Sequence, residues 1–124
     1  MIALDAMGGD FAPAAAVEGA LRARRERGLE VLLVGDEPRL KDELRRVGAG
    51  EGELRIHHAS EAVEMGEHPG TAMRRKKDNS IRVAFELVKA GQAAGMLSAG
   101  NSGAVLHCFT ASITFATISR VSHA

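Results

Sequence analysis

Three short segments of this 124-residue sequence combine residue types that suit the binding of an anion. The first, residues 98–103, reads Ser-Ala-Gly-Asn-Ser-Gly and follows the apolar run of residues 93–97. A strand that passes through glycines into a helix exposes backbone N–H groups, which favour a phosphate or a developing oxyanion. Plain connections have the same pattern, so this segment alone is also compatible with a structural turn.

The second segment places two carboxylates, Asp5 and Asp10, around the turn formed by Gly8 and Gly9. Either carboxylate could orient a ligand or take part in proton transfer. In the alternative, Asp10 simply caps a helix that begins near Pro13. The sequence leaves both interpretations open.

The third segment, residues 74–77, reads Arg-Arg-Lys-Lys and concentrates four positive charges in a chain whose sixteen basic and sixteen acidic residues cancel. An anionic substrate or an acidic carrier protein could bind to these charges. A run of charges is also typical of a solvated face.

The histidines and the single cysteine give weaker signals. His57 and His58 are neighbours on an expected strand and point to opposite faces, so no metal site is predicted. His68 precedes a Pro-Gly corner, where its imidazole could be structural or could contact substrate. Cys108 has no base placed near it by the sequence, which favours a plain thiol over a nucleophile.

Composition indicates one soluble, globular domain with a modest core, since 45% of the residues are hydrophobic. A net charge of zero and 3% aromatic residues argue against a nucleic-acid interface. One cysteine excludes an internal disulfide framework, and neither a leader nor a membrane-spanning apolar run is evident. A cytoplasmic protein is therefore expected.

The pattern of apolar residues predicts strands and helices in alternation. Strands are expected at residues 2–7, 30–36, 53–59 and 93–97, and helices at residues 13–27, 37–47 and 81–89. Residues 60–77 are irregular and are expected to leave the sheet. This order predicts an α/β fold, a twisted parallel sheet with helices on both faces, and ligands at the carboxyl ends of the strands. The relevant turns follow Met7, Gly35, Ser60 and Ser98.

Taken together, residues 5–10, 75–80 and 98–104 resemble the bacterial phosphate acyltransferases of phospholipid synthesis, which move a fatty acyl group from acyl carrier protein to inorganic phosphate. The resemblance covers residues 1–106. It implies a Rossmann-like fold related to isopropylmalate dehydrogenase and phosphotransacetylase, and acyl phosphate as the product, used next to acylate glycerol 3-phosphate. It also implies a homodimer, peripheral contact with the inner face of the membrane, and no cofactor or metal.

The resemblance and the chemistry of the segments together predict roles for individual residues. Phosphate is already an anionic nucleophile, so the site must hold it against the thioester and stabilise the oxyanion. We expect Asp10 to orient a group or accept a proton, and Lys76 or Lys77 to neutralise charge. The residues expected to bind phosphate or the oxyanion are Ser98, Gly100, Asn101, Ser102 and Gly103, with Asn101 also counted as catalytic. The residues expected to contact substrate are Gly8, Gly9, His68 and Arg75.

The chain also departs from the family's pattern. Family members are much longer, and residues 107–124 are rich in Ser, Thr and β-branched residues where an Ala- and Leu-rich helix would be expected. We therefore expect an N-terminal α/β part at residues 1–106 and a divergent, disordered or frame-shifted tail at residues 107–124. Two other functions stay open: an inactive fragment of the enzyme that pairs with another chain, and a phosphate- or nucleotide-binding module.

Overall fold

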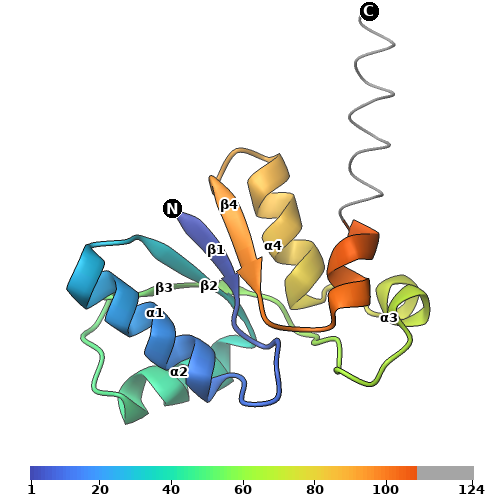
Figure 1. Cartoon of the computed structure of the whole chain (residues 1–124). Helices are drawn as coiled ribbons and strands as arrows, with labels where there is room; N and C mark the ends of the chain where they lie inside the picture. The colour runs from blue at the N-terminus through green and yellow to red at the C-terminus, as the bar shows by residue number, and fades with distance from the viewer. Residues whose placement is uncertain (109–124) are drawn as a thin grey trace, which may run out of the picture.

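The computed structural model describes residues 1–108 and shows a four-stranded sheet with helices on both faces (Figure 1). The strands are β1 (Ile2–Asp5), β2 (Val31–Gly35), β3 (Arg55–His58) and β4 (Gly95–Ser98). All pairs are parallel and the order is β3-β2-β1-β4. This arrangement confirms the predicted α/β, Rossmann-like fold.

One face of the sheet is covered by α1 (Ala14–Arg27) and α2 (Glu37–Arg46), which follow β1 and β2. Val17 and Leu21 of α1 and Leu40 of α2 pack there with Leu33 of the central strand β2. The helix α1 ends where the sequence predicts, because Gly28 adopts a φ of 65° and its N–H bonds back to Arg24. The short connections keep both helices next to the strands that they follow.

The opposite face is covered by α4 (Ser80–Lys89), whose Val83, Ala84 and Leu87 pack against Leu32 and Val34 of β2. Successive residues of β2 therefore enter two different cores, as expected for a strand buried on both faces. The helix begins at the predicted cap, since Asn79 Oδ1 accepts the Arg82 N–H at 2.9 Å.

Residues 59–68 leave the sheet after β3, as predicted, and lead into the short helix α3 (Pro69–Arg75), which the sequence pattern does not predict. Seven residues with Pro and Gly at the start are too few to show a helical repeat of apolar residues. Figure 1 shows α3 at the far right, beside the helix that starts after β4. This excursion forms a wall beside the carboxyl ends of the strands.

The strand β4 is the edge of the sheet, and a helix begins at residue 102 directly after it. Ala104 and Cys108 of this helix pack with Met73 of α3 and Ile81 of α4, so the helix lies on the same face as α4. Within residues 1–108, no helix has the length and apolar character that crossing a bilayer requires. Most of the predicted tail, from residue 109 onward, lies outside the described residues.

Candidate active site

The carboxyl ends of β1 and β4 are the point where the chain turns in opposite directions. After β1 it continues into α1 on one face, and after β4 into the helix on the other face. In open α/β sheets this divergence creates the crevice in which ligands bind. The turns at residues 6–10 and 98–101 therefore meet at the carboxyl ends of the strands, where a ligand is expected (Figure 1).

The two turns are in direct contact through their glycines. A Cβ added to Gly8 would lie 2.8 Å from the backbone nitrogen of Gly100 and 2.5 Å from Oδ2 of Asp5. Gly9 has a φ of 98°, and a Cβ there would lie 3.3 Å from the Ala99 carbonyl oxygen. Glycine is required at both positions, because the backbones approach too closely for a side chain and Gly9 adopts a left-handed conformation.

Asp5 lies beneath this contact and is only 1% exposed. Its carboxylate accepts hydrogen bonds from the Ser80 hydroxyl at 2.5 Å, the Ser98 hydroxyl at 2.7 Å and the Met7 N–H at 3.1 Å. These donors come from the chain itself, so both carboxylate oxygens are already engaged by the protein. Asp10, the other carboxylate of the segment, is exposed and is the one that can meet a ligand.

Asn101 has most of its hydrogen-bonding capacity engaged by the protein and is 6% exposed. Its Oδ1 accepts the Ala104 N–H at 3.1 Å, which caps the helix, while Nδ2 donates to the carbonyl oxygens of Glu64, Met65 and Glu67. The catalytic role expected for this side chain would require some of these bonds to be exchanged, and it stays a prediction.

The other groups expected to bind phosphate differ in how available they are. The Gly100 N–H donates to Ser98 Oγ at 3.1 Å, so that amide is already paired. Ser102 is exposed and begins the helix, and Gly103 follows it beside Pro69 of α3. The Ser102 hydroxyl and the backbone of the first helical turn are the better placed donors of this segment.

Lys76 is turned toward the excursion rather than toward solvent. Its ammonium donates to the Ala62 carbonyl oxygen at 2.8 Å and forms an ion pair with Glu67. The hydrogen bond from Lys76 and a second one from the Glu64 N–H hold the pKa of Glu67 below its usual value. Lys76 and Asn101, both predicted to be catalytic, thus both form hydrogen bonds that hold residues 62–67 in place.

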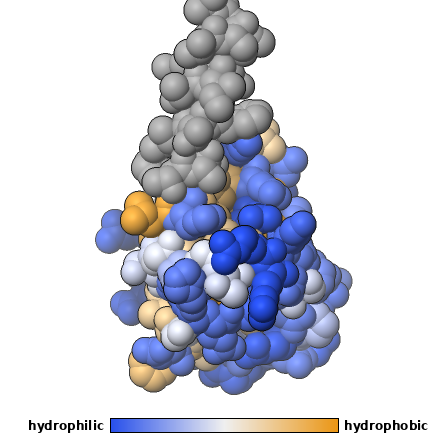
Figure 2. Space-filling model, turned by 90° about the vertical axis from the view of Figure 1, so that its right-hand side faces the viewer, coloured by the Kyte–Doolittle hydropathy of each residue, from blue (hydrophilic) through white to orange (hydrophobic). Residues whose placement is uncertain are grey.

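The remaining cations of the third segment, Arg74, Arg75 and Lys77, are exposed. The side of the molecule on which α3 lies in Figure 1 faces the viewer in Figure 2 and is largely hydrophilic. His68 Nδ1 accepts the Thr71 N–H at 3.3 Å, so the imidazole caps α3. Contact of Arg75, Lys77 or His68 with substrate stays a prediction.

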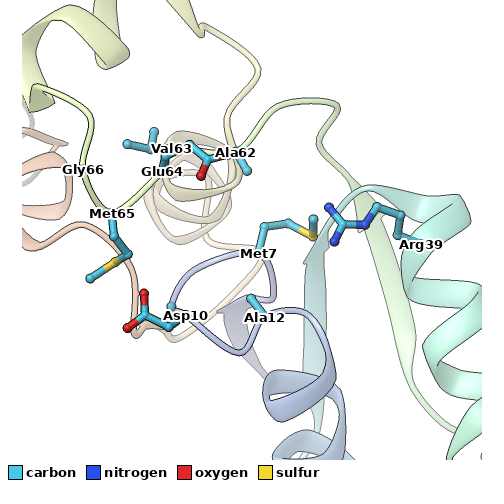
Figure 3. Close-up of a pocket in the computed structure, with 10 residues that line it drawn as sticks. Met7, Asp10, Ala12, Arg39, Ala62, Val63, Glu64, Met65 and Gly66 are labelled. Atoms are coloured by element: carbon cyan, nitrogen blue, oxygen red, sulfur yellow. The ribbon is translucent and has the colours of Figure 1, made fainter.

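A cavity of about 350 Å³ lies between the turn after β1, the helix α2 and the excursion (Figure 3). It is lined by Met7, Gly9, Asp10, Ala12, Arg39, Ala62, Val63, Glu64, Met65 and Gly66. An adjoining cavity of similar volume shares Met7, Arg39, Ala62 and Glu64 and extends to Lys76. The cavities thus contain Gly9, Asp10 and Lys76 of the predicted site, but not Arg75, Lys77 or His68.

Arg39 and Glu64 are charged residues of this cavity that belong to none of the three sequence segments. In Figure 3 the Arg39 guanidinium extends toward Met7, and the Asp10 carboxylate lies on the side of Met65. Arg39 could have been found from topology, because it follows the turn at the carboxyl end of β2. Glu64 lies in an irregular segment whose path no local pattern predicts.

The charges of the cavity limit where an anion can bind. Asp10 and Glu64 would repel a phosphate, and Arg39 is the cation that could attract it. Near Asp10 the cavity suits an uncharged or proton-donating group, which this carboxylate can orient. Cys108 lines neither cavity, and burial raises the pKa of its thiol to about 11.

Comparison with known proteins finds a matching family and named relatives. Residues 1–122 match the family described as "Fatty acid synthesis protein". The chain is 63% identical over 106 residues to the "Phosphate acyltransferase" of Anaeromyxobacter sp. (strain Fw109-5), which covers 85% of this chain and 29% of the relative. Proteins of the same name match from Myxococcus xanthus (strain DK1622), with 58% identity over 106 residues, and from Trichlorobacter lovleyi, with 53% over 105 residues; each match covers 85% of this chain and 30% of the relative.

The chain thus spans about 30% of the length of the curated relatives that it matches. Residues 1–122, which match the family, include β1 to β4 and both glycine turns. These findings show that the chain belongs to the fatty acid synthesis protein family, together with enzymes named phosphate acyltransferase.

Proposed function

We propose that this chain forms part of a site that transfers a fatty acyl group from acyl carrier protein to inorganic phosphate, giving acyl phosphate for phospholipid synthesis. The observation that carries the proposal is the 63% identity to a phosphate acyltransferase over 106 residues, together with a family match over residues 1–122 that includes both glycine turns. The contact of Gly8 with Gly100 at the divergence of β1 and β4 supports it, since anions bind in such crevices.

The reaction needs little acid–base chemistry from the protein. A phosphate oxygen attacks the thioester carbonyl carbon, and the tetrahedral oxyanion then collapses with cleavage of the C–S bond. The carrier leaves as a thiolate that takes up a proton. Positioning of the phosphate and stabilisation of the oxyanion are therefore the main contributions expected of the site.

In this proposal the donors to phosphate and oxyanion are Ser102 and the backbone at residues 101–103. Arg39, in the cavity that also contains Asp10, is a cation that attracts the phosphate. Asp10 orients the incoming group or accepts its proton. Lys76 and Asn101 hold the wall formed by residues 62–67 and remain candidates for direct contact. Arg74, Arg75 and Lys77, exposed beside that wall, are the groups proposed to meet an acidic carrier protein.

Family resemblance further suggests a homodimer that touches the inner face of the membrane peripherally and works in the cytoplasm without a cofactor. These features belong to the proposal. The second candidate is a chain that binds phosphate without turnover, and the contact of Gly8 with Gly100 at the divergence of β1 and β4 supports binding alone.

An assay of product formation separates the two candidates. The purified chain is incubated with acyl-acyl-carrier-protein and phosphate, and acyl phosphate is trapped with hydroxylamine as the hydroxamate. The Anaeromyxobacter relative serves as positive control, and omission of phosphate as the blank. Phosphate-dependent hydroxamate from the chain supports the enzyme. Product from the relative alone contradicts activity of this chain, and ³¹P line broadening of inorganic phosphate then tests binding without turnover.

A further inference from the structure

Asp5 connects three segments that are far apart in the sequence. Its hydroxyl partners are Ser80, 75 residues away, and Ser98, 93 residues away. Ser80 is the first residue of α4, and Ser98 is the last residue of β4, so the carboxylate joins the ends of β1 and β4 to the start of the helix between them. A single side chain thus fixes the relative position of these segments.

Both carboxylate oxygens are engaged, each toward a different segment. Oδ1 accepts the Ser80 hydroxyl and the Met7 N–H, and Oδ2 accepts the Ser98 hydroxyl. Ser98 Oγ in turn accepts the Gly100 N–H at 3.1 Å. A continuous chain of hydrogen bonds therefore runs from the carboxylate to the second glycine turn.

The glycines of both turns pack against the same carboxylate. A Cβ on Gly8 would lie 2.5 Å from Asp5 Oδ2, and a Cβ on Gly100 would lie 3.2 Å from that atom and 3.1 Å from Gly8 Cα. A methyl group at Gly8 would force its neighbours to shift, and a methyl group at Gly100 would require its neighbours to give by a few tenths of an ångström. The position of the Asp5 carboxylate therefore determines how closely the two turns pack.

A charge in this position is poorly explained by stability alone. Among residues 1–108 no lysine or arginine forms an ion pair with Asp5, and burying a carboxylate costs hydration energy. The hydroxyl and amide donors and the N-terminus of α4 offset that cost. A buried anion with donors from three segments is well suited to hold a fixed geometry.

We propose that Asp5 is the positioning residue of the site: from a position that is only 1% exposed, and acting through Ser98 and Ser80, it sets the separation of the turns at residues 8–9 and 98–101. The effect on catalysis rests on the proposed function, but the positioning itself does not. Because misplacement of a binding group by about 1 Å can lower a rate about 10²-fold, loss of Asp5 should impair phosphate use more than it impairs folding.

The structural test uses the full chain labelled with ¹⁵N-glycine. Asp5→Asn is expected to shift the Gly8 and Gly100 amide signals and to speed hydrogen exchange at Gly100 about fivefold to tenfold, as for loss of an ordinary hydrogen bond. Ser98→Ala should do the same at Gly100, and adding Asp5→Asn to it should have little further effect there. Ser98→Thr, which keeps the hydroxyl, should restore protection. Gly28 and Gly91 serve as remote reporters, and the exposed Asp42→Asn as the matched control.

The functional arm measures KM for phosphate and kcat in the hydroxamate assay. Asp5→Asn is expected to lower kcat/KM for phosphate at least about tenfold, and the double variant with Ser98→Ala to lose little more. If the wild-type chain yields no product, the proposed function fails while the glycine signals still decide the positioning role. Unchanged Gly8 and Gly100 signals in Asp5→Asn, or additive effects with Ser98→Ala, would overturn the proposal. Should Asp5→Asn not fold, Ser80→Ala and Ser98→Ala decide it by the same signals.

Discussion

At the level of single residues, the side chains expected to do chemistry also build the site. Lys76 donates to the backbone of Ala62 and pairs with Glu67, and Asn101 donates to three carbonyl oxygens of residues 64–67. Sequence shows which residue types are present, but it cannot show that a charge is already paired. A motif residue can therefore be essential because it positions the wall of a cavity as well as because it touches a substrate.

The contact between the two turns predicts a large effect of one methyl group. Gly8→Ala would place a Cβ 2.5 Å from Asp5 Oδ2 and 2.8 Å from Gly100 N, so we expect a loss of about 1–3 kcal/mol in the free energy of unfolding. Urea denaturation measures it. Gly19→Ala is the matched control: it has open space in α1, and the higher helix propensity of alanine should leave stability equal or up to about 1 kcal/mol higher. Equal effects of the two variants would contradict the packing described here.

An ion pair on the α1 side predicts a dependence of stability on pH. The Arg25 guanidinium and the Gly50 N–H lower the pKa of Glu53 from 4.5 to about 2 in the folded protein. Because the folded pKa is below the unfolded one, Glu53 stabilises the protein above pH 4.5, and this contribution is lost as the pH falls toward 2.

Urea midpoints of wild type and Glu53→Gln should therefore differ at pH 7 and converge as the pH falls from 4.5 toward 2. Glu51→Gln, an exposed neighbour, is the control and should show no such convergence. A difference between Glu53→Gln and wild type that stays constant from pH 7 to pH 2.5 would rule out this ion pair as its source.

At the level of elements, alternation of apolar runs and turns was enough to predict each strand and three of the four labelled helices. The strand β2 carries a strong local signal, because its five residues lie between turns and are buried or half-buried. The helix α1 carries another, the C-terminal Gly28, which has a positive φ. The helix α3 does not, because His68, Pro69 and Gly70 start it without an apolar repeat. Local patterns report local structure, so the excursion could be predicted only as a departure from the sheet.

The residues of the candidate site likewise fall into those that the sequence can place and those that only the tertiary fold places. Topology alone places Gly9 and Asp10 at the carboxyl end of β1, and both line the cavity. Arg39 follows the carboxyl end of β2 and could be placed in the same way. The contribution of Glu64 depends on how far the excursion reaches across the sheet, which no spacing in the sequence reports. The pairing of Asp5 with Ser80 and Ser98 spans most of the described chain and likewise follows from the tertiary fold alone.

The two functions of Asn101 at its helix can be separated by substitution. Asn101→Ala removes the cap of the helix at residue 102 and the donors to residues 64–67, so we expect a loss of about 1–3 kcal/mol in the free energy of unfolding. Asn101→Asp keeps an acceptor for the Ala104 N–H but places a carboxylate against three carbonyl oxygens. Amide exchange should rise at residues 62–67 in both variants and at the helix start only in Asn101→Ala. Unchanged exchange at residues 62–67 would show that Asn101 does not hold the excursion.

At the level of the whole molecule, the sheet is covered unevenly. The helices α1 and α2 pack over β1, β2 and β3, but the same face of β4 has no helix of the described chain over it. Leu97 of β4 is 63% exposed and Phe11, in the turn after β1, is 80% exposed. Both line an apolar groove of about 410 Å³ that runs between the two turns. An edge strand beside an apolar groove is a surface that favours association.

This surface leads to a prediction about the purified chain. We expect its apparent mass in size-exclusion chromatography with light scattering to increase with concentration, because association removes Leu97, Phe11 and the edge of β4 from water. Leu97→Lys should shift the onset of association to at least about tenfold higher concentration, since burying a lysine at the contact costs more than the roughly 1.4 kcal/mol that this factor requires. Leu29→Lys is the matched control, because Leu29 is also exposed but lies between α1 and β2, away from the groove.

If both variants associate like the wild type, the contact between chains lies elsewhere. If the wild type stays monomeric at all concentrations, the groove and the edge of β4 do not drive association, in spite of their exposure.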